Sequence, residues 1–267
     1  MKALKTFEDE LLMFLERFDH AVQGFTSEDD DALELERVVD EYSRFILDDA
    51  YIEKWGQLER KGVPSEVYLL RKASAFAVAT LEKHRAHALL KGRTGKADYF
   101  ENIESCIDEE FGSFQVTSES VVLLVGSGSF PMTPLVIARR TGAKVLGIDI
   151  DEEAVTLGRR VVESLGSGLD IRLEQKSVEE LENLREVTHI IFSSTVEVKY
   201  DLLDQLHDLT GDGVVVSMRY GNGLKSLFNY PSEEVDAGKW ITAGNVIRPD
   251  QIFDLFIYEK ALRGGVR

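Results

Sequence analysis

The segment Val121–Asp151 constrains the fold more than any other part of the sequence. It reads VVLLVGSGSFPMTPLVIARRTGAKVLGIDID: an unbroken apolar run, a turn with two glycines, a helical stretch and a second apolar run that ends in acid. An apolar run without polar gaps is typical of a strand buried on both faces, and Gly126 and Gly128 permit a sharp turn and close approach to a ligand. Asp149 follows about twenty residues later, where nucleotide-binding folds hold a ribose. The segment therefore predicts the first half of a Rossmann-like α/β sheet.

The glycine turn departs from the fingerprint of dinucleotide-binding proteins. A third glycine near position 131 would let the following helix pack closely on the sheet, but Pro131, Met132 and Thr133 stand there. Proline suits the first helical turn because it lacks only an N–H that the helix would leave unpaired, and Thr133 supplies a hydroxyl. We therefore expect a ligand without a pyrophosphate, and not NAD.

Motifs in both halves of the chain agree with one known family. The run GSGSFPMT has the pattern G-x-G-x-x-P-x-T. The run MRYGNGLKSLFNYP places Arg219, Gly223 and Lys225 in the pattern Arg-x-x-x-Gly-x-basic, and Pro231 also stands at the position that the pattern requires. Both resemble the nicotianamine synthase family. The upstream segments LEKHRAHALL and DYFENIESCIDEEFG are similar to the helical segments that carry that family's active-site glutamate and tyrosine. The resemblance spans roughly residues 35–260 and is closest to the bacterial branch that makes opine metallophores of the staphylopine type.

The resemblance implies an activity and a pair of catalytic residues. It implies a transferase that uses S-adenosylmethionine as cosubstrate and moves its aminocarboxypropyl (aminobutanoyl) group, releasing methylthioadenosine; in the bacterial branch the acceptor is histidine. Glu82 would take the proton from the acceptor amine or hold that amine for attack, and Tyr99 would orient the donor's amino group or relay the proton. The product would pass to an opine dehydrogenase. The sequence leaves open the chirality of the histidine and the oligomeric state, a homodimer included.

The predicted donor site follows the carboxyl ends of the strands, where open parallel sheets bind their ligands. Asp149 is expected to accept hydrogen bonds from the ribose, although it could instead cap the helix that begins at Asp151. Gln175 ends the third predicted strand, where an adenine contact is expected, and Ser193, Ser194 and Thr195 end the fourth, although polar residues also end strands for ordinary turn reasons. The whole predicted set comprises Gly126, Ser127, Gly128, Pro131, Met132, Thr133, Asp149, Asp151, Gln175, Ser193 and Ser194.

The predicted acceptor site draws on basic residues from both halves. Arg219 and Lys225 could bind the carboxylates of donor and acceptor, and an arginine can do so through two parallel hydrogen bonds. The alternative is that both side chains are simply solvated. His84 could contact an imidazole or a carboxylate, but it also falls on an apolar stripe, where a packed histidine is equally expected. Arg85 lies three residues after Glu82, so an exposed ion pair on one helix is the ordinary alternative to a catalytic role for Glu82.

Composition excludes several classes of protein. The formal net charge of -17 repels phosphate backbones and anionic lipid, so we expect no role at nucleic acid or at a membrane surface. The single cysteine, Cys106, excludes an internal disulfide. The first residues are too acidic for a signal peptide, and no apolar run approaches the ~20 residues that cross a bilayer, so the cytoplasm is the expected compartment.

The hydrophobic period changes once along the chain. Apolar residues recur at helical spacing up to about Phe111, which predicts a helical domain over residues 1–118 that covers the active site. Strands then alternate with helices, which predicts a mainly parallel Rossmann-like sheet over residues 119–267. The strands are expected at Val121–Val125, Lys144–Ile150, Asp170–Glu174, His189–Ser193, Gly213–Met218 and Phe253–Glu259.

No metal site is expected, because the five histidines are scattered and the single cysteine has no partner. Two other functions remain open at this point. The first is a small-molecule methyltransferase that uses the same fold and cosubstrate. The second is a ligand-binding or sensor protein whose helical half is an interaction module.

Overall fold

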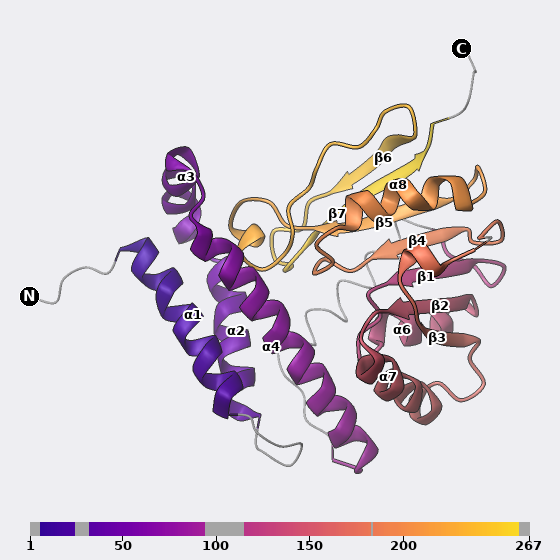
Figure 1. Ribbon diagram of the computed structural model, residues 1–267, viewed down its shortest axis with the longest axis horizontal. Helices are drawn as coiled ribbons and strands as arrows, with labels where there is room; N and C mark the ends of the chain where they lie inside the picture. Colours follow the sequence, from indigo (N-terminus) through magenta and orange to yellow (C-terminus); the bar gives the residue numbers. More distant parts are fainter. Residues whose placement is uncertain (1–5, 25–31, 94–114, 183, 262–267) are drawn as a thin grey trace, which may run out of the picture.

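The computed structural model describes residues 6–24, 32–93, 115–182 and 184–261. Its amino-terminal half is helical, as predicted, and Figure 1 shows these helices gathered on one side of a sheet. Apolar residues at the predicted spacing, such as Phe7, Leu11, Phe14 and Phe18, are buried. The elements are α1 (Phe7–Gly24), α2 (Leu33–Ile46), the 3₁₀ helix η1 (Asp49–Tyr51), α3 (Ile52–Lys61) and α4 (Ser65–Leu90).

The carboxyl-terminal half contains a sheet of seven strands in the order β3-β2-β1-β4-β5-β7-β6. The first five strands are parallel, and β7 runs antiparallel to β5 and to β6. This arrangement confirms the predicted Rossmann-like α/β fold preceded by helices. The strands are β1 (Val121–Val125), β2 (Lys144–Asp149), β3 (Ile171–Gln175), β4 (His189–Phe192), β5 (Val215–Tyr220), β6 (Trp240–Val246) and β7 (Asp254–Lys260).

The sequence analysis missed β6. This strand lies at the edge of the sheet, and all of its side chains except Trp240 are exposed or half-buried. Its pairing with β7 also shifts register between Thr242 and Gly244. An exposed and irregular edge strand has neither an apolar run nor a clean alternation, so it carries no period that a sequence can reveal.

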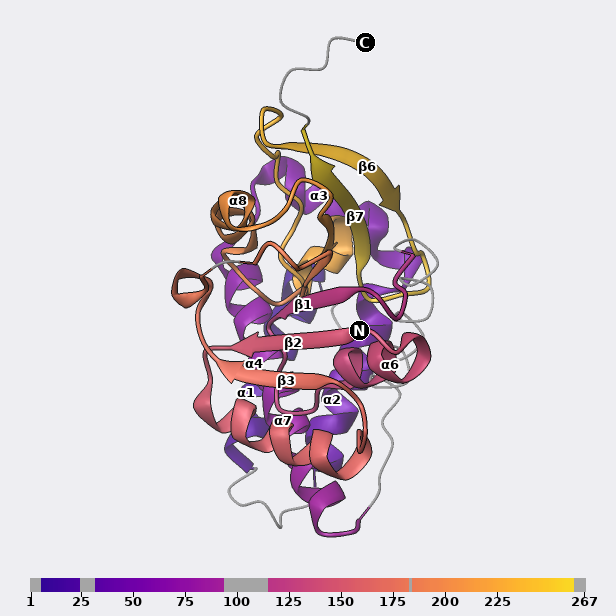
Figure 2. The ribbon, with the colours of Figure 1, turned by 90° about the vertical axis from the view of Figure 1, so that its right-hand side faces the viewer.

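Helices cover both faces of the sheet. The side chains of β1 alternate: Val122 and Leu124 pack with α6, whereas Leu123 and Val125 pack with α8. The sheet thereby buries both faces, as its unbroken apolar strands predict. Figure 2 shows β1, β2 and β3 side by side, with α7 next to β3. The covering elements are α6 (Met132–Thr141), α7 (Glu152–Leu165), η2 (Val178–Glu180), α8 (Lys199–Leu209) and η3 (Gly223–Leu227).

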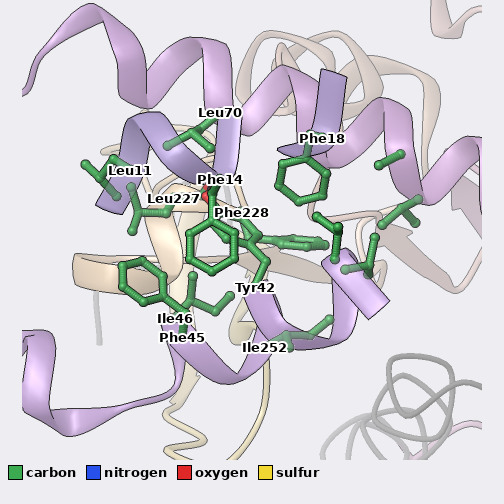
Figure 3. Close-up of a cluster of buried hydrophobic side chains, with 14 of the residues drawn as sticks. Leu11, Phe14, Phe18, Tyr42, Phe45, Ile46, Leu70, Leu227, Phe228 and Ile252 are labelled. Atoms are coloured by element: carbon green, nitrogen blue, oxygen red, sulfur yellow. Dashed lines mark hydrogen bonds between the residues drawn. The ribbon is translucent and has the colours of Figure 1, made fainter. Parts of the chain in front are cut away.

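One hydrophobic core joins the two halves. Tyr42, which is fully buried, donates a hydrogen bond of 2.8 Å from its hydroxyl to the Leu227 carbonyl, and its ring lies 5.9 Å from that of Phe228. Ile252 and Phe253, which precede β7, belong to the same cluster as the helical residues. Figure 3 shows Ile252, Leu227 and Phe228 of this cluster together with Phe14 and Tyr42. The core therefore crosses the predicted division at residue 118.

Helix α4 lies across the carboxyl ends of the strands. It packs against α7 at one end of the sheet and against η3 at the other. Within the described residues no helix is both long and apolar enough to cross a membrane.

Candidate active site

The turn after β1 is shaped by its two glycines. Gly126 and Gly128 have φ angles of +84° and +66°, in the left-handed region that side chains disfavour. A Cβ atom on Gly126 would lie 3.0 Å from Val196, and one on Gly128 would overlap the Glu82 carboxylate. Gly128 is therefore required both by its backbone and by a side chain that reaches it from α4.

Asp149 fixes this turn from the end of β2. Its two carboxylate oxygens accept hydrogen bonds from the Gly128 N–H at 2.9 Å and from the Asp151 N–H at 3.1 Å. Asp151 is the residue that caps α7, because its carboxylate accepts from the N–H groups of Glu153 and Ala154. The alternative in which Asp149 is merely the helix cap is thus wrong, and Asp149 lies beside the glycine turn as the motif predicts.

Glu82 points from α4 toward the same turn. Burial first, and then the nearby Asp149 carboxylate, raise the pKa of Glu82 from 4.5 to about 8, while the Ser129 N–H and Arg85 act in the opposite direction. An exposed pair with Arg85 does not describe this residue, since the Arg85 guanidinium lies 4.6 Å over the Phe130 ring. A carboxyl with such a pKa can exchange a proton near neutral pH, which a general acid or base requires.

An ion-pair cluster joins α4 to α7 next to Glu82. The Lys83 ammonium lies 2.8 Å from the Asp151 carboxylate and 2.5 Å from that of Glu153. These contacts hold the carboxyl-terminal part of α4 against the start of α7. Lys83 therefore helps to set where the neighbouring Glu82 lies relative to the glycine turn.

A cavity of about 80 Å³ lies between α4 and the strand ends. Arg219, on β5, lines it and is buried rather than solvated: its guanidinium donates to the Thr133 hydroxyl at 3.2 Å and lies 4.9 Å from the Phe253 ring. The predicted residues at the cavity are Glu82, Gly126, Ser127, Met132, Thr133, Ser193, Ser194 and Arg219. Thr195, which the sequence analysis named at the end of the fourth strand, also lines it, as do Val78, Leu124, Phe130 and Phe253.

The family profile described as "Nicotianamine synthase protein" matches residues 52–260. This chain belongs to the nicotianamine synthase family. Two relatives are named L-histidine 2-aminobutanoyltransferase: that of Pseudomonas aeruginosa (strain PAO1) is 32% identical over 86% of this chain and 87% of its own length, and that of Yersinia pestis is 36% identical over 76% of each.

Solved structures show the same fold. The crystal structure of MtNAS in complex with MTA and tNA superposes with a TM-score of 0.78 at 16% identity, over 97% of this chain and 100% of that one. A mutant of MtNAS in complex with S-adenosylmethionine gives a TM-score of 0.76 at 15% identity, with the same coverage. The likeness includes both the helical half and the sheet.

Several predicted residues of this nicotianamine synthase family protein either lie off the cavity or fall outside the described residues. Lys225 is engaged within the protein: its ammonium donates to the Arg248 carbonyl at 2.5 Å and to the Asp254 carboxylate at 2.6 Å, so its expected role with a substrate carboxylate loses support. Pro131 precedes α6 instead of beginning it. Tyr99 lies outside the described residues. Gly128, Asp149 and Asp151 border the turn, while His84, Arg85 and Gln175 do not line the cavity.

The sequence analysis also missed Lys199, at the start of α8. This side chain is fully buried, and its Nζ donates to the carbonyls of Ser194, Arg219 and Tyr230 at 3.4, 2.7 and 3.0 Å. The end of β5, the residue that follows β4 by two positions and the segment around Tyr230 are thus held by one group. No sequence signal distinguishes this lysine from a solvated one, because its partners are main-chain atoms.

No group of three or more histidine, cysteine, aspartate or glutamate side chains in the described ranges is arranged to hold a metal ion.

Proposed function

We propose that this protein transfers the 3-amino-3-carboxypropyl group of S-adenosylmethionine to the α-amine of L-histidine and releases methylthioadenosine. The observation that carries the proposal is the Glu82 carboxyl, which lies against the glycine turn with its pKa raised to about 8. Membership of the nicotianamine synthase family supports the class of reaction, and the names of the two relatives support the acceptor.

The chemistry is a displacement at one of the three carbons bonded to the sulfonium. The histidine nitrogen forms a bond to the γ-carbon of the aminocarboxypropyl group while the bond from that carbon to sulfur breaks. Its electron pair stays on sulfur, so methylthioadenosine leaves as a neutral thioether. The amine must lose a proton, because a free α-amine has a pKa of roughly 8 and is largely protonated near neutral pH.

Glu82 is the proposed acceptor of that proton. Its pKa of about 8 is close to that of the amine, so proton transfer between the two is nearly balanced. The sulfonium is a cation, and its arrival next to Glu82 and Asp149 favours the ionised carboxylate. Donor binding would therefore convert Glu82 from a neutral acid into the base that the reaction needs.

The donor itself would lie along the strand ends. Asp149 is proposed to exchange its hydrogen bond with the Gly128 N–H for hydrogen bonds from the ribose hydroxyls, and Gln175 to approach the adenine. The backbone of the glycine turn, with Met132 and Thr133, would contact the methionine part, and Arg219 its carboxylate. Tyr99, outside the described residues, is proposed to orient the donor's amino group.

Two wider proposals rest on the resemblance to the staphylopine-type branch. The product is a precursor of an opine metallophore and passes to an opine dehydrogenase. The protein acts in the cytoplasm, with a homodimer as its proposed assembly.

Incubation of the protein with S-adenosylmethionine and L-histidine tests the reaction. Chromatography of the nucleoside product separates the alternatives, because methylthioadenosine indicates aminocarboxypropyl transfer and S-adenosylhomocysteine indicates methyl transfer. Unconsumed donor would favour a ligand-binding protein. Either of the last two results would refute the proposed function.

A further inference from the structure

Lys199, the first residue of α8, is a fully buried lysine that binds the wall of the cavity from behind. Its Nζ donates to the carbonyls of Ser194, Arg219 and Tyr230 at 3.4, 2.7 and 3.0 Å. Ser194 and Arg219 line the cavity, whereas Lys199 itself does not. One ammonium thus joins the segment after β4 to the end of β5, and both of these segments contribute side chains to the cavity.

Packing does not account for an ammonium at this place. The Ser194 carbonyl also accepts from the Tyr230 N–H at 3.2 Å, and the Tyr230 carbonyl accepts from the Gly221 N–H at 3.2 Å, so neither depends on Lys199 for a hydrogen bond. Burial, and after it the charge of Arg71, lowers the pKa of Lys199 to about 7. The charged form is therefore disfavoured here, and an apolar side chain of similar length would fill the same space.

The shortest of the three contacts leads to the buried cation of the cavity wall. Lys199 holds the main chain of Arg219, and the Arg219 guanidinium donates to the Thr133 hydroxyl at 3.2 Å and lies 4.9 Å from the Phe253 ring. Thr133, Arg219 and Phe253 all line the cavity. Because the main chain and the guanidinium of Arg219 are both held, a shift of the main chain would move the guanidinium relative to Thr133.

We propose that Lys199 is a positioning residue of the donor site, which fixes the main chain of Ser194 and Arg219 so that the guanidinium meets the carboxylate of the aminocarboxypropyl group. The inference rests on the proposed function in one respect, the contact between Arg219 and that carboxylate. A bidentate contact requires the guanidinium and the carboxylate to be aligned, so a small displacement of the main chain weakens it. Lys199 acts through Arg219, and its effect is confined to the amino-acid part of the donor.

Two ligands separate this role from a structural one. S-adenosylmethionine carries the carboxylate, and methylthioadenosine is the same molecule without the aminocarboxypropyl group. Calorimetric titration of the whole protein with each ligand would compare the wild type with Lys199→Met. A general loosening of the strand ends would weaken both ligands, whereas a loss of positioning at Arg219 weakens only the first.

The matched control is Lys260→Met. Lys260 is also buried, and its Nζ donates to the carbonyls of His207 and Thr210 at 2.5 and 2.8 Å. Both carbonyls have a second donor, as in the group around Lys199. Lys260 is the last residue of β7, next to the amino end of β5, and therefore lies at the opposite end of the sheet from the cavity.

The expected result is a loss of affinity that depends on the ligand. Lys199→Met should raise the dissociation constant of S-adenosylmethionine about tenfold, the usual effect of weakening a hydrogen bond to a charged group. Its affinity for methylthioadenosine should stay near the wild-type value, and Lys260→Met should bind both ligands as the wild type does. The double variant Lys199→Met/Arg219→Gln should bind S-adenosylmethionine no more weakly than Arg219→Gln alone, because both changes act on the same contact.

A variant that does not fold would not end the test. If Lys199→Met fails to fold, Lys199→Gln carries the same comparison, because its shorter side chain cannot reach all three carbonyls. The same ligand-dependent loss of affinity is expected.

Several results would overturn the inference. An unchanged affinity of Lys199→Met for S-adenosylmethionine, an equal loss for both ligands, or an equal loss in Lys260→Met would each mean that Lys199 has only a structural role. Additive effects of Lys199→Met and Arg219→Gln would mean that Lys199 does not act through Arg219. The proposed function is judged separately, by methylthioadenosine release with L-histidine. If that release is absent, the titrations still decide the role of Lys199, and a wild-type protein that binds no S-adenosylmethionine would refute both.

Discussion

Replacing Glu82 by glutamine should remove a pH dependence of stability that this side chain alone creates. The folded protein holds the Glu82 proton up to a pKa of about 8, whereas the ordinary value in an unfolded chain is 4.5. Between these pH values the folded state binds a proton that the unfolded state has lost. The free energy of unfolding therefore falls as the pH rises through this window, and the Glu82 contribution becomes constant below 4.5 and above about 8.

The slope of the free energy of unfolding against pH has an upper limit, because only one proton is involved. It cannot exceed about 1.4 kcal/mol per pH unit, and the part of Glu82 that stays accessible to water reduces it. For a chain of this size each kcal/mol shifts the melting temperature by about 2–4 °C. The advantage of Glu82→Gln over the wild-type protein should thus grow by up to a few degrees per pH unit on going from pH 5 to pH 8.

Thermal denaturation of both proteins across this range measures the effect, with Glu163→Gln as the control for removing an exposed carboxylate. Turnover at saturating substrates should fall about 10²–10⁴-fold in Glu82→Gln, because the proton acceptor is gone. A constant difference in melting temperature from pH 5 to pH 8 would show that Glu82 is not held protonated in the folded state. Near-normal turnover would remove it from the mechanism.

Three further substitutions test the donor site. Asp149→Ala should weaken S-adenosylmethionine binding by roughly 1.5–3 kcal/mol through loss of charge-assisted hydrogen bonds; an unchanged affinity in calorimetric titration would exclude Asp149 from the site. Gly128→Val should abolish turnover, because the new side chain would overlap Glu82. The control is Gly142→Val: Gly142 also has a positive φ, +76°, but a Cβ there would lie 3.5 Å from the nearest atom, so this variant should lose stability and retain activity. Equal activities of the two variants would contradict the steric argument. Lys83→Met should lower turnover several-fold. Turnover of the variant should also depend less on salt concentration than that of the wild-type protein, because the ion pairs of Lys83 with Asp151 and Glu153 are partly exposed and therefore screened by ions. An identical salt dependence of turnover in the two proteins would mean that these pairs do not position α4.

The sequence predicted those parts of the site that depend on local chemistry. The six predicted strands lie within two residues of the observed bounds at both ends, because most of them contain an apolar run that is closed by a turn. Gly126 and Gly128 have the backbone conformation that the motif requires, and Asp149 lies beside them because the carboxyl ends of parallel strands share one edge. Glu82 could be identified only through the resemblance of its segment to a family motif, because nothing in the spacing of residues distinguishes a catalytic glutamate on a helix from an ordinary one.

Other features depend on long-range packing and left no local signal. Val78 and Phe253 read as ordinary core residues, although they line the cavity. Arg219 gave no sign of being buried, because its partners Thr133 and Phe253 lie 86 and 34 positions away along the chain. The pairing of Lys225 was hidden for the same reason: its partner Asp254 is 29 residues distant, and only the fold brings the two together.

The core that joins the helices to the sheet bears on how such a protein can be rebuilt. Leu227, Phe228, Ile252 and Phe253 belong to loops of the sheet half, yet they fill the same cluster as Phe14, Phe18 and Tyr42. Separating the chain near residue 118 would expose these side chains to water on both fragments. The helical half is therefore not a module that could be exchanged for the cap of another enzyme. A graft would also have to carry η3 and the loop before β7, and a single calorimetric transition should report both halves melting as one unit.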